Sequence, residues 1–222
     1  MHATLLRTLA CILALPAGVA AAQVGTLGIT VTTPGGEPIA DAVIVAVPLD
    51  PTGYATAKPR AEALEQIDKE FVPRVKPVFV GSTVAFPNRD SVRHHVYSFS
   101  PAKRFELPLY AGVPAQPVLF DKPGVVVLGC NIHDWMIGYV YVSESPWFAR
   151  TDAQGRALIG DVPPRAYMVR VWHPQQEGSE DETRRRVDVI AGQRAEVAWA
   201  VALKPEVRVR RAPTGGAHAG HY

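Results

Sequence analysis

The chain has few sulfur-containing side chains: its 222 residues include two cysteines and three methionines. Cys11 lies in an apolar N-terminal segment, so removal of that segment would leave Cys130 as the only thiol. A protein with one thiol cannot form an internal disulfide, and it lacks the two or more cysteines of most iron–sulfur and structural zinc sites. In an exported protein, an unpaired cysteine is either a reactive thiol or the ligand of a bound group.

Long apolar runs are missing after the first 22 residues. Those residues combine Arg7, an apolar stretch over residues 9–19 and three alanines that end at Ala22, a combination typical of a cleaved secretory signal peptide. The stretch is shorter than the roughly 20 residues that a membrane-spanning helix requires. We therefore expect cleavage near Ala22, no membrane span, and a soluble protein that is periplasmic or secreted.

An excess of charge of either sign is also absent. The 23 basic and 21 acidic residues give a net charge of +2, which loss of Arg7 lowers to +1. The arginines at 184–186 follow the acidic residues at 180–182, so we expect them to be solvated and locally paired. This balance offers no electrostatic basis for binding nucleic acid.

Turn residues and Val-rich runs are plentiful, with 18 glycines and 20 prolines, and they favour short strands joined by turns. The nearly all-apolar run over residues 42–47 indicates a strand covered on both faces. We read residues 66–68 and 71–73 as one opening strand, although the composition of 61–68 is also compatible with a helix. The Pro-rich stretch between 100 and 117 is expected to cover a sheet edge. Further strands are predicted over residues 26–32, 75–80, 83–86, 92–99, 118–121, 124–130, 137–142, 186–190 and 195–203, which together indicate an all-β protein built of sandwiches.

One short segment carries most of the chemistry. Directly after the apolar run 125–128, the sequence places Cys130, His133 and Met136 in a Cys-x-x-His-x-x-Met spacing. A thiolate, an imidazole and a weak thioether suit copper, and two histidines with one cysteine and an axial methionine describe electron-transfer copper. This set lacks a second histidine, which the segment 87–97 supplies as His94 or His95.

The region from about Gln66 to Val142 resembles a cupredoxin, a small β-sandwich that holds one type 1 copper ion. The Cys-x-x-His-x-x-Met spacing is similar to that of the short-loop members, whose last three ligands come from the final strand–loop–strand. The resemblance therefore implies that Cys130, His133 and Met136 are ligands of one copper ion.

The resemblance also implies the first ligand. His94 is followed, after one residue, by Val96, as in the His-Asn-Val pattern of the family. This chain has His95 where asparagine is usual, so His95 stays open as the alternative to His94.

The same resemblance implies how electrons would enter and leave. His133 is expected on the rim of the site with one edge toward solvent, as the electron port. Ile132 and Trp135 would flank it and form an apolar collar on which a transient redox protein partner docks.

A second family resemblance covers the rest of the chain. The Thr-Asp-x-x-Gly motif at 151–155 and the Val-Pro-x-x-x-Tyr motif at 162–167 resemble the second half of a carboxypeptidase-regulatory-like (transthyretin-like) sandwich. Its first half is similar to residues 25–48. We therefore predict one split transthyretin/Ig-like sandwich, because neither half could bury its apolar strands alone. The predicted domains are a signal peptide over 1–22, the split sandwich over 24–58 and 146–205, a nested cupredoxin-like Greek-key domain over 61–145, and a disordered tail over 206–222.

These patterns predict a non-catalytic electron carrier or redox partner domain with one type 1 copper ion. Exported chains of this layout also resemble proteins labelled methylamine utilisation protein. A copper oxidase or nitrite reductase would need a second, histidine-rich copper site, for which the remaining histidines are too few and scattered. The alternatives are a copper carrier or sensor, and an interaction module in which copper is structural; no oligomeric state is predicted.

Overall fold

The computed structural model describes residues 23–50, 57–114 and 116–205. The predicted signal peptide and C-terminal tail lie outside the described residues, as does the middle of the Pro- and Gly-containing stretch after Leu49. The described part is almost entirely β-structure, with one short 3₁₀ helix, η2 (Glu180–Thr183). It contains no helix with the length and apolar character needed to cross a membrane.

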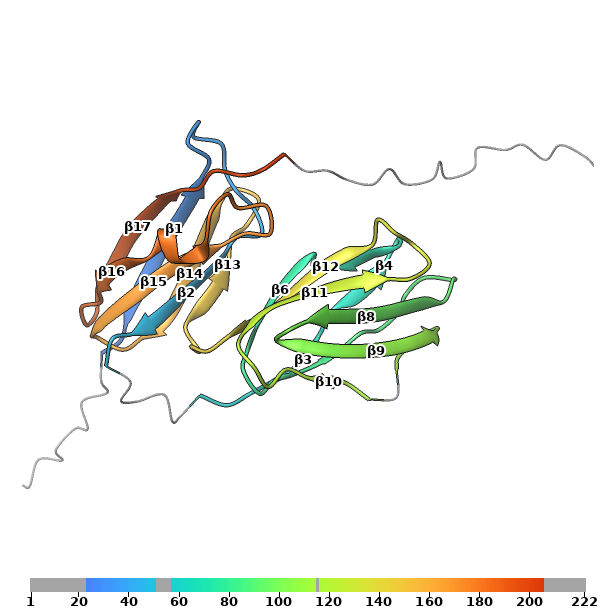
Figure 1. Cartoon of the computed structure of the whole chain (residues 1–222). Helices are drawn as coiled ribbons and strands as arrows, with labels where there is room; N and C mark the ends of the chain where they lie inside the picture. The colour runs from blue at the N-terminus through green and yellow to red at the C-terminus, as the bar shows by residue number, and fades with distance from the viewer. Residues whose placement is uncertain (1–22, 51–56, 115, 206–222) are drawn as a thin grey trace, which may run out of the picture.

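One sandwich combines strands from the two ends of the described chain (Figure 1). Its first sheet has the order β14-β1-β17, and its second sheet has the order β13-β2-β15-β16. A single apolar core lies between them and includes Leu27, Ile44, Val169 and Trp199. The bounds are β1 (Gly25–Thr32), β2 (Val43–Pro48), β13 (Phe148–Arg150), β14 (Arg156–Val162), β15 (Ala166–Trp172), β16 (Arg185–Asp188) and β17 (Arg194–Ala200).

The central part of the chain forms the sandwich that carries Cys130. Its main sheet has the order β6-β12-β11-β8-β9, and a smaller sheet has the order β10-β7-β3. Phe86, Phe120 and Leu128 are fully buried in its core. The bounds are β3 (Ala61–Ala63), β4 (Glu65–Ile67), β5 (Glu70–Val72), β6 (Val75–Phe79), β7 (Thr83–Ala85), β8 (His94–Ser100), β9 (Lys103–Tyr110), β10 (Val118–Leu119), β11 (Gly124–Cys130) and β12 (Ile137–Ser143).

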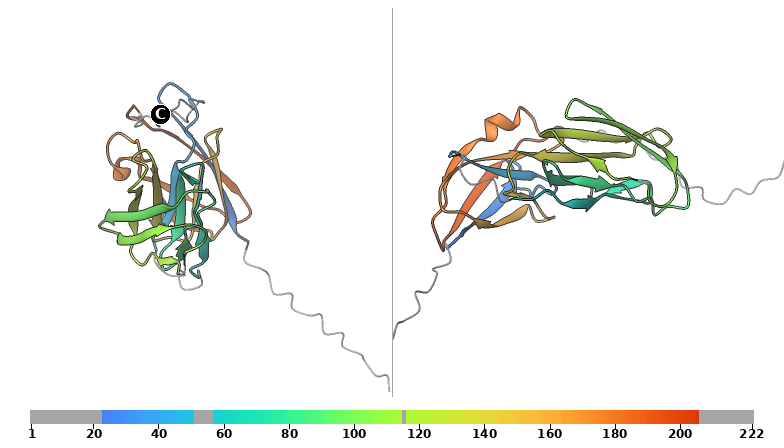
Figure 2. Two further views of the ribbon diagram at one scale, coloured as in Figure 1. Left: turned by 90° about the vertical axis from the view of Figure 1, so that its right-hand side faces the viewer. Right: turned by 90° about the horizontal axis from the view of Figure 1, so that it is seen from below.

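The two sandwiches lie side by side and share a small apolar cluster (Figures 1 and 2). Val43 and Val45 of β2 pack there with Tyr141 of β12, and the ring of Trp172 lies 5.4 Å from that of Tyr141. The alternate residues of β2, including Ile44, face the core between the two sheets of the first sandwich. Strand β2 is therefore covered on both faces, as its apolar sequence predicts.

Two expectations about local structure are wrong. The segment predicted as one opening strand lies in the hairpin of β4 (Glu65–Ile67) and β5 (Glu70–Val72), because Asp68 and Lys69 adopt φ values of 54° and 60°. Such left-handed pairs belong to the two-residue turns of hairpins. The Pro-rich stretch contains β9, which pairs with β8 and is itself the edge strand of the main sheet. An edge strand tolerates Pro108 because one side of its backbone needs no ladder partner.

Candidate metal centre

Cys130 ends strand β11, and a short loop leads from it into β12. The two strands pair antiparallel up to Gly129 and Ile137, so the loop must reverse within a few residues. Within it, the backbone N–H of Met136 donates to the carbonyl of His133 (2.9 Å). This tight turn brings His133 Nδ1 to 3.7 Å from Cys130 Sγ.

His94 reaches the same point from the neighbouring strand. Strand β8 pairs with β11 such that Val96 lies opposite Cys130. Side chains alternate along a strand, so His94 and Val96 share the face that points into the core. The His94 ring is fully buried, and its Nδ1 lies 3.8 Å from Cys130 Sγ.

The three donor atoms fit a single metal ion. His94, Cys130 and His133 each offer one ligand atom, and these atoms lie within 4.8 Å of one another. Metal–sulfur and metal–nitrogen bonds of about 2.3 and 2.0 Å, at an angle near 120°, separate the two donors by roughly 3.7 Å. The two sulfur–nitrogen distances, 3.7 and 3.8 Å, match that value.

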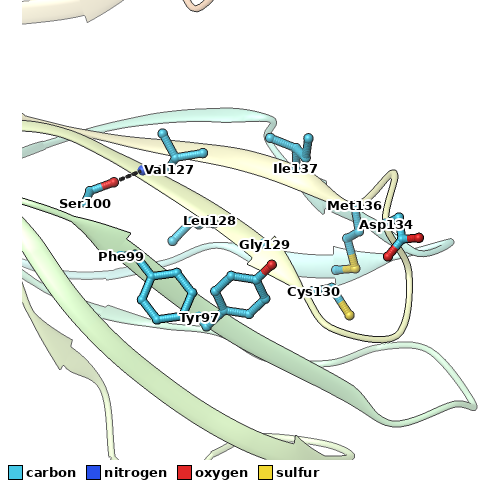
Figure 3. A pocket seen from close by; sticks show the side chains of 10 residues that line it. All are labelled: Tyr97, Phe99, Ser100, Val127, Leu128, Gly129, Cys130, Asp134, Met136 and Ile137. Atoms are coloured by element: carbon cyan, nitrogen blue, oxygen red, sulfur yellow. Dashed lines mark hydrogen bonds between the residues drawn. The ribbon is translucent and has the colours of Figure 1, made fainter. Parts of the chain in front are cut away.

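Met136 adds a thioether beside the thiol. Its side chain is 1% exposed and belongs to the same buried cluster as Cys130. Both residues line one pocket, and Figure 3 shows their sulfur atoms where β11 enters the loop. A thiolate, two imidazoles and a thioether form the donor set of electron-transfer copper.

The second ring nitrogen of His94 has a charged partner. Its Nε2 lies 2.7 Å from Asp90 Oδ2. Burial of Asp90 acts to raise the pKa of its carboxyl group, but hydrogen bonds from His94 and from the backbone N–H groups of Lys69 and Asp68 outweigh it and hold the pKa below its usual value. The carboxylate therefore accepts a hydrogen bond from the Nε2–H group, which leaves the lone pair of the ring on Nδ1.

His133 lies at the edge of the site and is partly exposed. Burial lowers the pKa of its imidazole, and the charges of His94 and Lys69 lower it further, against the opposing charge of Asp90. The neutral ring, which is the metal-binding form, is therefore favoured. Ile132 beside it is 48% exposed, and the ring of Trp135 lies 5.3 Å from that of His133.

His95, the alternative first ligand, lies on the other face of the sheet. Its ring packs near that of Tyr97, at a centroid distance of 5.6 Å, and its Nε2 lies 3.0 Å from a carboxylate oxygen of Glu106. The structure therefore brings His94, and not His95, to Cys130 and His133.

Two further residues shape the site. Asp90 was not among the residues singled out from the sequence, although its position four residues before His94 is a usable signal. Asn88 orders the loop before His94: its side chain accepts from the N–H of Asp90 and donates to the carbonyls of Val92 and Tyr110.

No protein-family model matches the chain, and no curated protein matches it. Among solved structures it is similar to a copper-containing nitrite reductase from Thermus scotoductus, with 28% identity and a TM-score of 0.36 over 44% of this chain and 27% of that one. It is also similar to a purple cupredoxin from Nitrosopumilus maritimus (26% identity, TM-score 0.33, covering 37% of this chain and 99% of that one). A reduced amicyanin mutant gives 22% identity and a TM-score of 0.34 over 45% and 98% of the two chains. The chain thus spans about a quarter of the nitrite reductase.

Proposed function

We propose that this protein is an exported electron carrier or redox partner domain that holds one copper ion between His94, Cys130, His133 and Met136. The observation that carries the proposal is the convergence of two imidazole nitrogens on one thiol sulfur, at 3.7 and 3.8 Å. A copper ion held there would take up and release one electron as it cycles between its two oxidation states.

The residues around the donors support such cycling because strand pairing and core packing fix their positions. Strands β8 and β11 fix His94 and Cys130, both of which are buried. Met136 is buried in the same core, beneath the loop that carries His133. A rigid donor set changes little between oxidation states, which is what fast electron transfer requires.

The exposure of the rim supports transient docking. His133 is partly exposed, its loop neighbour Ile132 is 48% exposed, and the ring of Trp135 lies 5.3 Å from the His133 ring. An apolar surface with a ligand edge at its centre suits the small, short-lived interfaces of redox proteins. We therefore include a transient redox protein partner, together with export of the mature chain, in the proposal.

The domain division is also part of the proposal. One core is built from residues between Leu27 and Ala46 together with residues between Trp147 and Leu203. The other core uses residues between Leu64 and Val142. We propose that the copper domain, residues 61–145, is inserted between the halves 24–58 and 146–205 of the second sandwich.

Addition of Cu(II) to the purified protein tests the copper assignment. We expect an intense thiolate-to-copper absorption band that disappears in Cys130→Ala and in His94→Ala. His95→Ala is the matched control, because it removes a neighbouring imidazole from the opposite face of the same strand, and it should keep the band. Loss of the band in His95→Ala alone would overturn the ligand set, while rapid loss of copper to a chelator would favour a copper carrier.

A further inference from the structure

We propose that Asp90 is a positioning residue that fixes the ring of His94 and lowers the reduction potential of the site. This inference rests on the proposed copper function, but its first step concerns the protein without metal. Asp90 is not a ligand in this account, because its carboxylate lies at the nitrogen of His94 that faces away from Cys130.

The carboxylate of Asp90 accepts three hydrogen bonds. Its Oδ1 accepts from the backbone N–H of Asp68 (2.7 Å), and its Oδ2 accepts from the backbone N–H of Lys69 (2.9 Å) and lies 2.7 Å from His94 Nε2. The side chain is only 12% exposed. A carboxylate that accepts three hydrogen bonds and has little contact with solvent is held in one orientation.

The β4–β5 turn supplies two of these donors because of its backbone conformation. Asp68 and Lys69 both have positive φ, so their successive N–H groups point to the same side of the β4–β5 hairpin. The loop that carries Asp90 is fixed separately, because the side chain of Asn88 accepts from the Asp90 N–H (2.9 Å) and donates to the carbonyl of Val92 (2.8 Å). Hydrogen bonds from the β4–β5 turn and from Asn88 thus fix Asp90 independently of its contact with His94.

This arrangement selects one tautomer of His94. A carboxylate can only accept, so Nε2 must carry the proton and Nδ1 must carry the lone pair. Nδ1 is the atom that faces Cys130 Sγ. Without Asp90, the buried ring could place its proton on either nitrogen and would lose its anchor.

The same carboxylate puts a negative charge one imidazole away from the metal position. A charge in a site with little solvent is weakly screened. It stabilises the doubly charged state of the ion more than the singly charged state, so it favours oxidation. Conversion to a neutral side chain should therefore raise the reduction potential.

Asp90→Asn is the variant that separates this role from simple packing. Asparagine has nearly the same shape, but it offers one acceptor oxygen and adds donors, so it cannot satisfy three N–H groups. Asp68→Asn is the matched control, because it also removes one negative charge, from the turn that contacts Asp90, but it keeps the backbone N–H and alters an exposed side chain.

Two measurements on the whole protein test the inference. Nitrogen-15 NMR of the metal-free protein should show His94 as the Nε2–H tautomer alone, and a mixture in Asp90→Asn. With copper, we expect Asp90→Asn to change the Cu(I)-to-Cu(II) affinity ratio about tenfold in favour of Cu(I), a rise of about 59 mV for one electron. Asp68→Asn should change the ratio less than twofold.

The outcomes are separable. A wild-type His94 that carries its proton on Nδ1 overturns the inference, even if Asp90→Asn does not fold. Equal shifts of the potential in Asp90→Asn and Asp68→Asn also overturn it, because they would reflect net charge alone. Absence of a thiolate-to-copper band in the wild type would overturn the proposed copper function, while the NMR of the metal-free protein would still decide what Asp90 does to His94.

Discussion

The ring of Tyr97 occupies the space beside Gly129, one residue before Cys130, into which any other residue would place its side chain. The two residues face each other across strands β8 and β11. A Cβ atom at position 129 would lie 2.7 Å from Tyr97 Cζ and 2.8 Å from its hydroxyl oxygen, well inside contact distance. The glycine therefore lets the tyrosine close over the backbone beside the thiol.

Gly129→Ala should destabilise the metal-free protein by about 1–3 kcal/mol, because the added methyl group overpacks this contact. Urea unfolding measures the change. Gly160→Ala is the matched control: that glycine also lies in a strand, and a Cβ there meets nothing within 4 Å. Equal stabilities of the two variants would show that Tyr97 yields without cost.

Arg170 joins the two sandwiches through ionic contacts. Its guanidinium lies 2.7 Å from both carboxylate oxygens of Glu144, and it also pairs with Glu180 and contacts the hydroxyl of Tyr141. Arg170→Ala leaves two partly buried carboxylates unpaired, so we expect a loss of stability on the order of 2 kcal/mol.

Thermal or urea unfolding of Arg170→Ala gives that value, and limited proteolysis should show faster cleavage at the junction. Arg186→Ala removes an arginine whose ion pair with Asp188 is 62% exposed on both sides, and it should cost less than about 1 kcal/mol. A similar loss in both variants would contradict the role assigned to Arg170.

Alkaline conditions should destabilise the protein through two tyrosines, the partly buried Tyr110 and the buried Tyr141. Burial raises the pKa of Tyr110 from 10.0 to about 12, and burial together with the charge of Glu180 raises that of Tyr141. The folded state thus favours the neutral phenols, and this stabilisation is complete below pH 10 and is lost as the pH rises to about 12 and beyond.

Urea unfolding at several pH values between 9 and 12 checks this sign. Each such tyrosine adds up to about 1.4 kcal/mol of lost stability per pH unit above its unfolded pKa. Tyr110→Phe should therefore show a shallower decline than the wild type. An identical slope in the variant would contradict the raised pKa of Tyr110.

Much of the candidate site could be predicted because three of its members lie within seven residues of one strand and loop. The spacing of Cys130, His133 and Met136 requires no knowledge of distant pairing. The sequence left His94 and His95 open as the first ligand, and the fold separates them because His94 lies on the strand face of the buried Val96. The burial of β2 on both faces followed equally from its unbroken apolar run.

The contact between Asp90 and His94 could not be predicted in the same way. It depends on the β4–β5 turn, whose Asp68-Lys69 pair lacks the glycine or asparagine that usually marks a two-residue hairpin turn. The residues on either side of the Asp68-Lys69 turn were therefore predicted to form one continuous strand. The contact of Asp90 with the turn links backbone groups 21 and 22 residues away, a separation that no local pattern encodes.

The contact between the two sandwiches could not be predicted for a similar reason. Tyr139 and Tyr141 alternate along β12 with residues of the core that contains Cys130, and no sequence pattern identifies what covers their face. Only the fold shows that Trp172, whose ring lies 5.8 Å from that of Tyr139, covers them.

X-ray absorption spectroscopy at the copper edge of the copper-loaded protein tests the central claim most directly, because it counts the donor atoms around the metal. The account predicts one copper ion per chain with one short sulfur bond and two nitrogen bonds, and loss of the sulfur contribution in Cys130→Ala. A first shell of oxygen and nitrogen alone in the wild type, or one unchanged in Cys130→Ala, would contradict it.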